Sequence, residues 1–145
     1  MKILVTGGAG FIGSNFILKY ISKNRILNYD KLTYAGNLNN LISIQNHKNY
    51  SFINGDIKDK KSIHKVISLF KPDAIINFAA ESHVDRSIDS PQDFIETNIL
   101  GTFILLKETL NFYQSLNKYK KQKFRFLHIS TDEVYGSLDK TKKFK

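Results

Sequence analysis

Residues 2–13 decide the fold, and they read KILVTGGAGFIG. The apolar run KILVT ends at two glycines, and apolar residues at helical spacing follow them. The glycines satisfy both G-x-G-x-x-G (Gly8, Gly10, Gly13) and G-x-x-G-x-x-G (Gly7, Gly10, Gly13). Glycine permits a tight turn and lets backbone N–H groups approach a pyrophosphate, which the N-terminus of the next helix attracts. The segment therefore predicts a dinucleotide-binding turn, with a plain glycine-rich turn as the alternative.

The rest of the chain alternates strand and helix patterns. Strands are predicted at Lys2–Thr6, Ile26–Tyr29, Tyr50–Ile53, Ala74–Phe78 and Phe124–Ser130. Helices are predicted at Phe11–Lys23, Asn37–Ile44, Asp59–Phe70 and Gln92–Asn117, and Lys118–Lys123 is predicted to be a charged connector. Five strands separated by helices indicate an α/β fold, a doubly wound parallel sheet with helices on both faces. Such sheets bind ligands beyond the carboxyl ends of their strands, near the point where the strand order reverses.

The composition is that of one globular domain. The 145 residues are 41% hydrophobic and 24% charged, and a chain of this length can bury a core. It contains no cysteine, which excludes disulfides and thiolate metal sites and favours a reducing compartment. No signal peptide is recognised, and no apolar stretch reaches the ~18 residues of a membrane span. We therefore expect a soluble, cytoplasmic protein without a membrane partner.

The formal charge of +9 does not indicate nucleic-acid binding. Residues 118–145 hold nine of the 22 basic residues and three of the 13 acidic ones, a net of +6, which leaves +3 for the rest. Nineteen of the basic residues are lysine and three are arginine, whereas nucleic-acid readers rely on arginine forks and aromatic stacking platforms. The basicity is interpreted as solvated surface, and no nucleic-acid partner is expected.

Two aspartates follow the second and third predicted strands. Asp30 stands 17 residues after Gly13. A carboxylate there accepts hydrogen bonds from an adenosine ribose and repels a 2′-phosphate, which favours NAD over NADP. Lys31 beside it weakens that exclusion, and a helix-capping role for Asp30 is the alternative. Asp56 is placed to bond the edge of an adenine, with Ile57 packing on the ring.

Polar residues also follow the fourth and fifth predicted strands. Ala79 and Ala80 let a flat cofactor lie across the strand end, where Ser82 and His83 could reach a substrate. A purely structural His83 is an equal alternative, and it has no metal-ligand spacing to the other histidines. Residues 130–136 read STDEVYG. Two adjacent acids in different environments can divide the roles of proton donor and proton acceptor, and the alternative is a pair of surface charges.

Taken together, the motifs resemble the dTDP-glucose 4,6-dehydratases of the extended short-chain dehydrogenase/reductase superfamily. They are GGAGFIG, LNYDKLTYAGN, GDI, NFAAESHVDRSI, FIETNILGT and HISTDEVYG, and they run from Met1 to about Leu138. The glycine motif indicates only the superfamily, whereas TDEVYG points to the nucleotide-sugar 4,6-dehydratases. The resemblance implies a Rossmann-type sheet, NAD as cofactor, dTDP-glucose as substrate, a homodimer and a place in rhamnose biosynthesis.

The resemblance also implies residue roles. Asp132 would protonate the departing C6 hydroxyl of the sugar, Glu133 would take the C5 proton, and Thr131 and Ser82 would bind the sugar. The residues implied to surround NAD are Gly7, Gly10, Phe11, Ile12, Gly13, Asp30, Lys31, Leu32, Thr33, Asp56, Ile57, Phe78, Ala79, Ala80, Glu81, Ser82 and Thr97. No metal is expected.

One departure from the family pattern concerns the tyrosine base. Family members oxidise C4 of the sugar with a Tyr-x-x-x-Lys pair, and Tyr135 here has no lysine four residues on. Residues 1–145 are therefore interpreted as the NAD-binding domain of such an enzyme, truncated before the later strands and the substrate domain and inactive alone. The alternatives are another nucleotide-sugar dehydratase or epimerase, or a non-catalytic NAD-binding remnant. The paired acids argue against an epimerase, which has no water to eliminate.

The same interpretation predicts how the chain behaves in solution. An open sheet edge at Phe124–Ser130 would leave backbone groups unpaired, and Gln92–Asn117 would expose apolar side chains. Repulsion between the flanking lysines is screened by salt. A marginally stable chain that self-associates more as salt rises is therefore expected.

Overall fold

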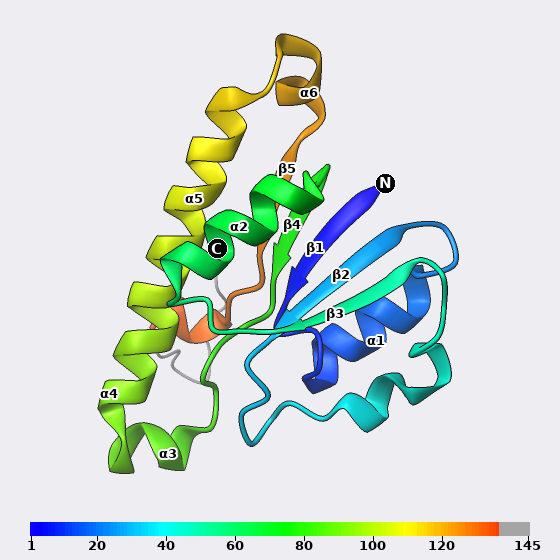
Figure 1. Cartoon of the computed structure of the whole chain (residues 1–145). Helices are drawn as coiled ribbons and strands as arrows, with labels where there is room; N and C mark the ends of the chain where they lie inside the picture. Colours follow the sequence, from blue (N-terminus) through cyan, green and yellow to red (C-terminus); the bar gives the residue numbers. More distant parts are fainter. Residues whose placement is uncertain (137–145) are drawn as a thin grey trace, which may run out of the picture.

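The computed structural model of the chain describes residues 1–136, apart from the side chains of Val84, Arg86, Asp132 and Glu133. Its strands form one parallel sheet in the order β3-β2-β1-β4-β5 (Figure 1). They are β1 (Lys2–Thr6), β2 (Arg25–Asp30), β3 (Tyr50–Asn54), β4 (Ala74–Asn77) and β5 (Arg125–His128). The order reverses between β1 and β4, so the carboxyl ends of these strands flank the usual ligand-binding point of such a sheet. The predicted fold class is confirmed.

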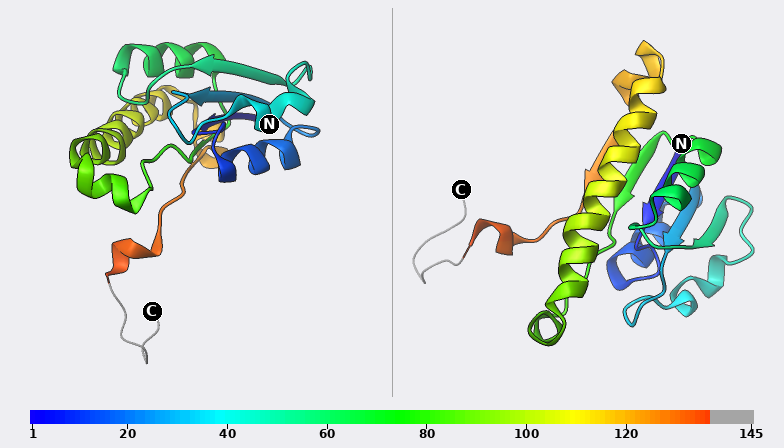
Figure 2. Two further views of the ribbon diagram at one scale, coloured as in Figure 1. Left: turned by 90° about the horizontal axis from the view of Figure 1, so that it is seen from below. Right: turned by 60° about the vertical axis from the view of Figure 1, so that its left-hand side comes forward.

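Helices cover both faces of the sheet. They are α1 (Phe11–Tyr20), the 3-10 helix η1 (Leu38–Ile44), α2 (Lys60–Phe70), α3 (Val84–Asp89), α4 (Pro91–Phe94), the π-helix η2 (Ile95–Gly101), α5 (Thr102–Ser115), α6 (Lys118–Lys123) and the 3-10 helix η3 (Asp132–Tyr135). Figures 1 and 2 show α1 and η1 on one face and α2 and α5 on the other.

The central strand β1 packs into both layers because successive side chains of a strand point to opposite faces. Val5 belongs to the core formed with Ile17 of α1. Leu4, the residue before it, belongs to the core formed with Ile63 of α2 and Leu105 of α5. A continuous apolar run therefore suits β1, which is buried on both sides.

The predicted helix over Gln92–Asn117 is helical but not uniform. α4, η2 and α5 follow one another directly, and the π-helical part ends at Gly101. A Cβ atom at Gly101 would lie 2.7 Å from Cγ1 of Ile57. The absence of that side chain lets η2 approach the loop after β3, and this approach matters for the site described below.

Two predictions about the secondary structure were wrong. Lys118–Lys123 is the short helix α6 and not a connector, because the Asn117 side chain caps it by accepting a hydrogen bond from Lys120 N at 2.9 Å. Its lysines also stand in the last turn, where the helix dipole favours positive charge. Residues 84–89 form α3, which the sequence analysis did not anticipate. No helix among residues 1–136 is long and apolar enough to cross a membrane.

Candidate functional site

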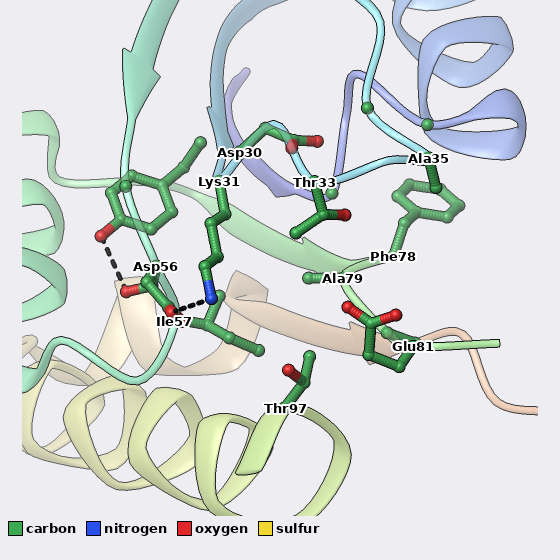
Figure 3. Close-up of a pocket in the computed structure, with 16 residues that line it drawn as sticks. Asp30, Lys31, Thr33, Ala35, Asp56, Ile57, Phe78, Ala79, Glu81 and Thr97 are labelled. Atoms are coloured by element: carbon green, nitrogen blue, oxygen red, sulfur yellow. Dashed lines mark hydrogen bonds and ion pairs between the residues drawn. The ribbon is translucent and has the colours of Figure 1, made fainter. Parts of the chain in front are cut away.

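A pocket opens at the carboxyl ends of β1, β2, β3 and β4, and η2 forms its remaining wall (Figure 3). Loops that are far apart in the sequence meet there because parallel strands end at the same edge of the sheet. The lining residues are Gly7, Gly10, Tyr29, Asp30, Lys31, Thr33, Ala35, Gly36, Gly55, Asp56, Ile57, Phe78, Ala79, Ala80, Glu81 and Thr97.

The glycine turn after β1 forms one end of the pocket, and its three motif glycines have different functions. Gly7 has a φ of +72°, and a Cβ atom there would lie 2.4 Å from Ala79 N. A Cβ atom at Gly13 would lie 2.4 Å from the Gly7 carbonyl oxygen. Gly10 is different, because its nearest neighbour would be 3.4 Å away and its missing side chain leaves the pocket open. The turn thus presents backbone at the start of α1, as a phosphate-binding turn requires.

Asp30 ends β2 and is held in place by backbone groups. Its Oδ2 accepts a hydrogen bond from Ala9 N at 2.8 Å, and its Oδ1 accepts one from Leu32 N at 2.8 Å. Leu32 itself has a φ of +57°, in the left-handed region. Asp30 is only 8% exposed, but a carboxylate has about four acceptor positions. It can therefore bind the glycine turn and a ribose hydroxyl together.

Charged side chains line the end of the pocket near Asp56. Lys31 Nζ lies 2.9 Å from Asp56 Oδ2, and Lys58 Nζ lies 3.9 Å from the same oxygen. Lys58 also forms an ion pair with Glu96 of η2. This hydrogen bond raises the pKa of Lys58 and lowers the pKa of Glu96. Positive and negative groups therefore alternate from the loop after β2 to η2.

The remaining walls are apolar side chains and backbone. Ile57 is 4% exposed and packs beside Gly101, so the loop after β3 rests on η2. On the opposite side, Asn98 of η2 holds the loop after β4 by accepting from Glu81 N at 2.8 Å and donating to Glu81 O at 2.8 Å. Figure 3 shows Thr97 facing the pocket between these two attachments. Consecutive residues of η2 thus fix two loops and form one wall.

Most of the predicted cofactor residues meet in this pocket, and a few do not. Phe11 and Ile12 are 82% and 61% exposed at the start of α1, outside the lining. Gly13 is buried under the turn, and Leu32 and Ser82 also fall outside the lining. Ser82 directly follows Glu81, the last residue of the loop after β4 that lines the pocket.

Four lining residues were missed by the sequence analysis: Tyr29, Ala35, Gly36 and Gly55. A Cβ atom at Gly55 would lie 2.4 Å from the Tyr29 ring, so ring and glycine fit one another. The Tyr29 hydroxyl donates to the Asp56 carbonyl oxygen at 3.0 Å, and burial raises its pKa. The sequence offered one signal for this part of the pocket, because the glycines in DKLTYAGN and in GDI each follow a predicted strand.

The predicted catalytic segment lies apart from the pocket. Thr131 is exposed, and Asp132 and Glu133 begin η3, which Figure 2 shows projecting away from the sheet beyond β5. No residue after Thr97 lines the pocket in the part of the chain that the structure describes. The roles of Thr131, Asp132 and Glu133 therefore stay predictions. The absence of a metal centre also stays a prediction, although no cluster of three ligand-type residues occurs within residues 1–136.

The sheet order, the glycine turn and the aspartate after β2 are typical of a dinucleotide-binding α/β domain. Residues 4–145 match the family described as GDP-mannose 4,6 dehydratase, and the chain belongs to this family of nucleotide-sugar dehydratases.

Similar proteins agree with this assignment. The chain is 55% identical over 140 residues to a dTDP-glucose 4,6-dehydratase from Escherichia coli, an alignment that covers 95% of this chain and 39% of that protein. A crystal structure of dTDP-glucose 4,6-dehydratase from Bacillus anthracis in complex with NAD has a TM-score of 0.80 and 43% identity, and covers 100% of this chain and 42% of the other. The enzyme from Streptomyces venezuelae with NAD bound has a TM-score of 0.84 and 41% identity, and covers 96% and 42%. The chain thus spans about two-fifths of the length of its relatives.

Proposed function

We propose that the protein to which this chain belongs is a dTDP-glucose 4,6-dehydratase and that residues 1–145 supply its NAD-binding part. The observation that carries the proposal is the buried Asp30 carboxylate, which two backbone N–H groups hold at the wall of a pocket that begins at a glycine turn. A fixed carboxylate at this position favours a ribose hydroxyl over a 2′-phosphate. The similar enzymes crystallised with NAD support the same cofactor.

The residues present suit NAD along the length of the pocket. Backbone around Gly7 and Gly10 would receive the pyrophosphate, Asp30 would receive the adenosine ribose, and Asp56 with Ile57 would contact the adenine. Ala79 and Ala80 leave a flat ledge at the end of β4. When bound, NAD supplies a reversible hydride acceptor for C4 of the sugar.

The chain's own residues would then carry out the elimination. Thr131 would bond the sugar near the C4 oxygen, which becomes a ketone oxygen when C4 is oxidised. The ketone makes the C5 proton acidic, so Glu133 can remove it as general base. Asp132 would protonate the C6 hydroxyl, which leaves as water. Because the proton is acidic only in the ketone, oxidation and elimination have to share one enclosed site.

The proposal includes a homodimer in the cytoplasm. One surface of η2 and α5 exposes large apolar side chains, among them Ile95, Ile99 and Phe103, which are 57%, 64% and 57% exposed. Exposed apolar side chains on neighbouring turns support a protein contact here. A chain without cysteine suits a reducing compartment.

Calorimetric titration of the chain with NAD and with NADP tests the cofactor, and NAD is expected to bind more tightly. Equal affinities would remove Asp30 from the proposed role. The reaction is tested with dTDP-glucose in a protein that spans the full length of the relatives, where a 4-keto-6-deoxy sugar is the expected product. Residues 1–145 alone are expected to release none, because they span only about two-fifths of the length of the relatives.

A further inference from the structure

The pocket wall between Asp56 and Thr97 is built from two segments that no strand pairing joins. Asp56 and Ile57 belong to the loop after β3, and Thr97 belongs to η2. Ladder hydrogen bonds fix the positions of the strand ends, but they do not fix the distance from this loop to the helix. Some other contact has to set the width of the pocket here.

Lys58 makes that contact in two ways. Its backbone N–H donates to Asp56 Oδ1 at 2.9 Å, which orients the Asp56 carboxylate. Its ammonium group pairs with Glu96, the residue before Thr97. The side chains of Lys58 and Glu96 are 24% and 33% exposed, so water screens this pair less than it screens a pair on the open surface.

Two neighbouring contacts explain why the position of Lys58 affects the pocket. Gln92 Nε2 donates to the second carboxylate oxygen, Glu96 Oε1, at 2.7 Å, so Glu96 is already oriented within its own helical segment. Ile57 packs against Gly101 one turn further along. The ion pair and this apolar contact together attach the loop to η2 at two points, with Asp56 and Thr97 on the pocket side of them.

We propose that Lys58 is a positioning residue for the adenosine end of the cofactor: through its ion pair with Glu96 it sets the gap between Asp56–Ile57 and Thr97 that receives the adenine. The inference rests on the proposed function, because it assumes that the pocket binds NAD. Lys58 itself does not line the pocket. Its effect is transmitted by the loop that it attaches.

The test is calorimetric titration of the 145-residue chain and its variants with ADP-ribose, which carries the adenosine half of NAD, and with inorganic pyrophosphate. Lys58→Met keeps an aliphatic stem and removes the charge. It is expected to weaken ADP-ribose binding by about threefold to fivefold, the range of a partly exposed ion pair. Lys58→Arg is expected to retain the wild-type affinity, and Lys60→Met, an exposed lysine two residues away, serves as the matched control for net charge.

Three comparisons distinguish positioning from general loosening of the fold. Pyrophosphate would contact only the glycine turn in the proposed binding mode, so its affinity is expected to be unchanged in Lys58→Met. Glu96→Gln is expected to weaken ADP-ribose as much as Lys58→Met does, and the double variant no more than either one. Equal losses for pyrophosphate and ADP-ribose, additive losses in the double variant, or an unchanged affinity in Lys58→Met would overturn the inference while leaving NAD binding intact. A wild-type chain that binds neither NAD nor ADP-ribose would overturn the proposed function and this inference together.

Discussion

The turns after β1 and β5 leave the same edge of one sheet, yet they are held very differently. The first turn is packed against the loop after β4, since a single added carbon at Gly7 would meet the backbone of Ala79. The second leads into η3, which projects from the sheet with Val134 and Tyr135 66% and 72% exposed (Figure 2). In the part of the chain that the structure describes, all residues that line the pocket lie between Gly7 and Thr97. The backbone of the segment that holds the residues proposed for elimination lies away from this pocket (Figure 2).

The largest expected effect comes from substitutions after β5, which leave the turn after β1 unchanged. In a protein that spans the full length of the relatives, Asp132→Asn and Glu133→Gln are each expected to lower turnover of dTDP-glucose by about 10²–10⁴-fold, the usual contribution of a general acid or base. NAD affinity should change little, because both residues are proposed to act on the sugar and not on the cofactor. Steady-state kinetics and calorimetry measure the two quantities. Normal turnover in both variants would contradict the assignment.

The next largest effect is expected from substitutions in the glycine turn after β1. Gly7→Ala is expected to cost about 2–4 kcal/mol of stability and to abolish NAD binding, because it combines a positive φ with a backbone collision. Gly10→Ala is the matched control. It should fold normally, since the added carbon meets nothing closer than 3.4 Å, but it should weaken NAD binding because Gly10 lines the pocket. Urea unfolding with calorimetry separates the outcomes, and equal stability of the two variants would show that the close approach to Ala79 is unimportant.

A substitution of Asp30 tests whether this residue stabilises the glycine turn, selects the cofactor, or does both. Asp30→Asn replaces one acceptor oxygen by an N–H donor, so either Ala9 N or Leu32 N loses its partner. A loss of about 1–3 kcal/mol of stability is expected, as for other buried donors left unsatisfied. The preference for NAD over NADP should narrow in the same variant. Unfolding curves and titrations with both nucleotides measure these effects, and an unchanged preference would leave Asp30 with a structural function only.

The smallest effect concerns pH. The ordinary pKa of a glutamate is 4.5, and the hydrogen bond from Lys58 lowers the pKa of Glu96 in the folded chain. A group whose pKa is lower in the folded state stabilises the fold above the unfolded pKa, and this contribution disappears as the pH falls through the folded pKa. Wild type should therefore exceed Lys58→Met in unfolding free energy at neutral pH, and the difference should vanish in strong acid. A difference that persists in acid would show that it does not arise from the ion pair with Glu96.

Local sequence signals predicted the parts of the molecule that local contacts determine. The predicted bounds of β1 are those of the structure, because a short apolar run between charged and glycine residues has few other solutions. The acidic cap of α2 is confirmed, since Asp59 accepts from Ser62 N at 3.0 Å. The glycine turn, Asp30 and Asp56 were also placed correctly at strand ends, because the chain order of strands fixes which loops meet.

Other features depend on contacts that no local pattern encodes. In the sequence Gly101 looks like an ordinary helix residue, and only the structure shows that Ile57 packs against it. The π-helical segment could therefore not be predicted. Phe11 and Ile12 have the spacing of buried helix residues, yet they stand at the open start of α1. The ion pair of Lys58 with Glu96 joins residues that are 38 positions apart. Tyr29 was counted only as part of a strand, because its fit to Gly55 appears only once β2 and β3 are paired.

The order in which the pocket residues occur has a consequence for how the protein is made. Every lining residue lies between positions 7 and 97, whereas η3 begins at Asp132, 35 residues later. At the usual ribosomal rate of about 5–20 residues per second, the last of these residues, Thr97, is synthesised about two to seven seconds before Asp132. Translation therefore supplies every pocket-lining residue of the described chain before either proposed catalytic carboxylate exists. The direction of synthesis places the proposed nucleotide-binding residues ahead of the proposed catalytic ones.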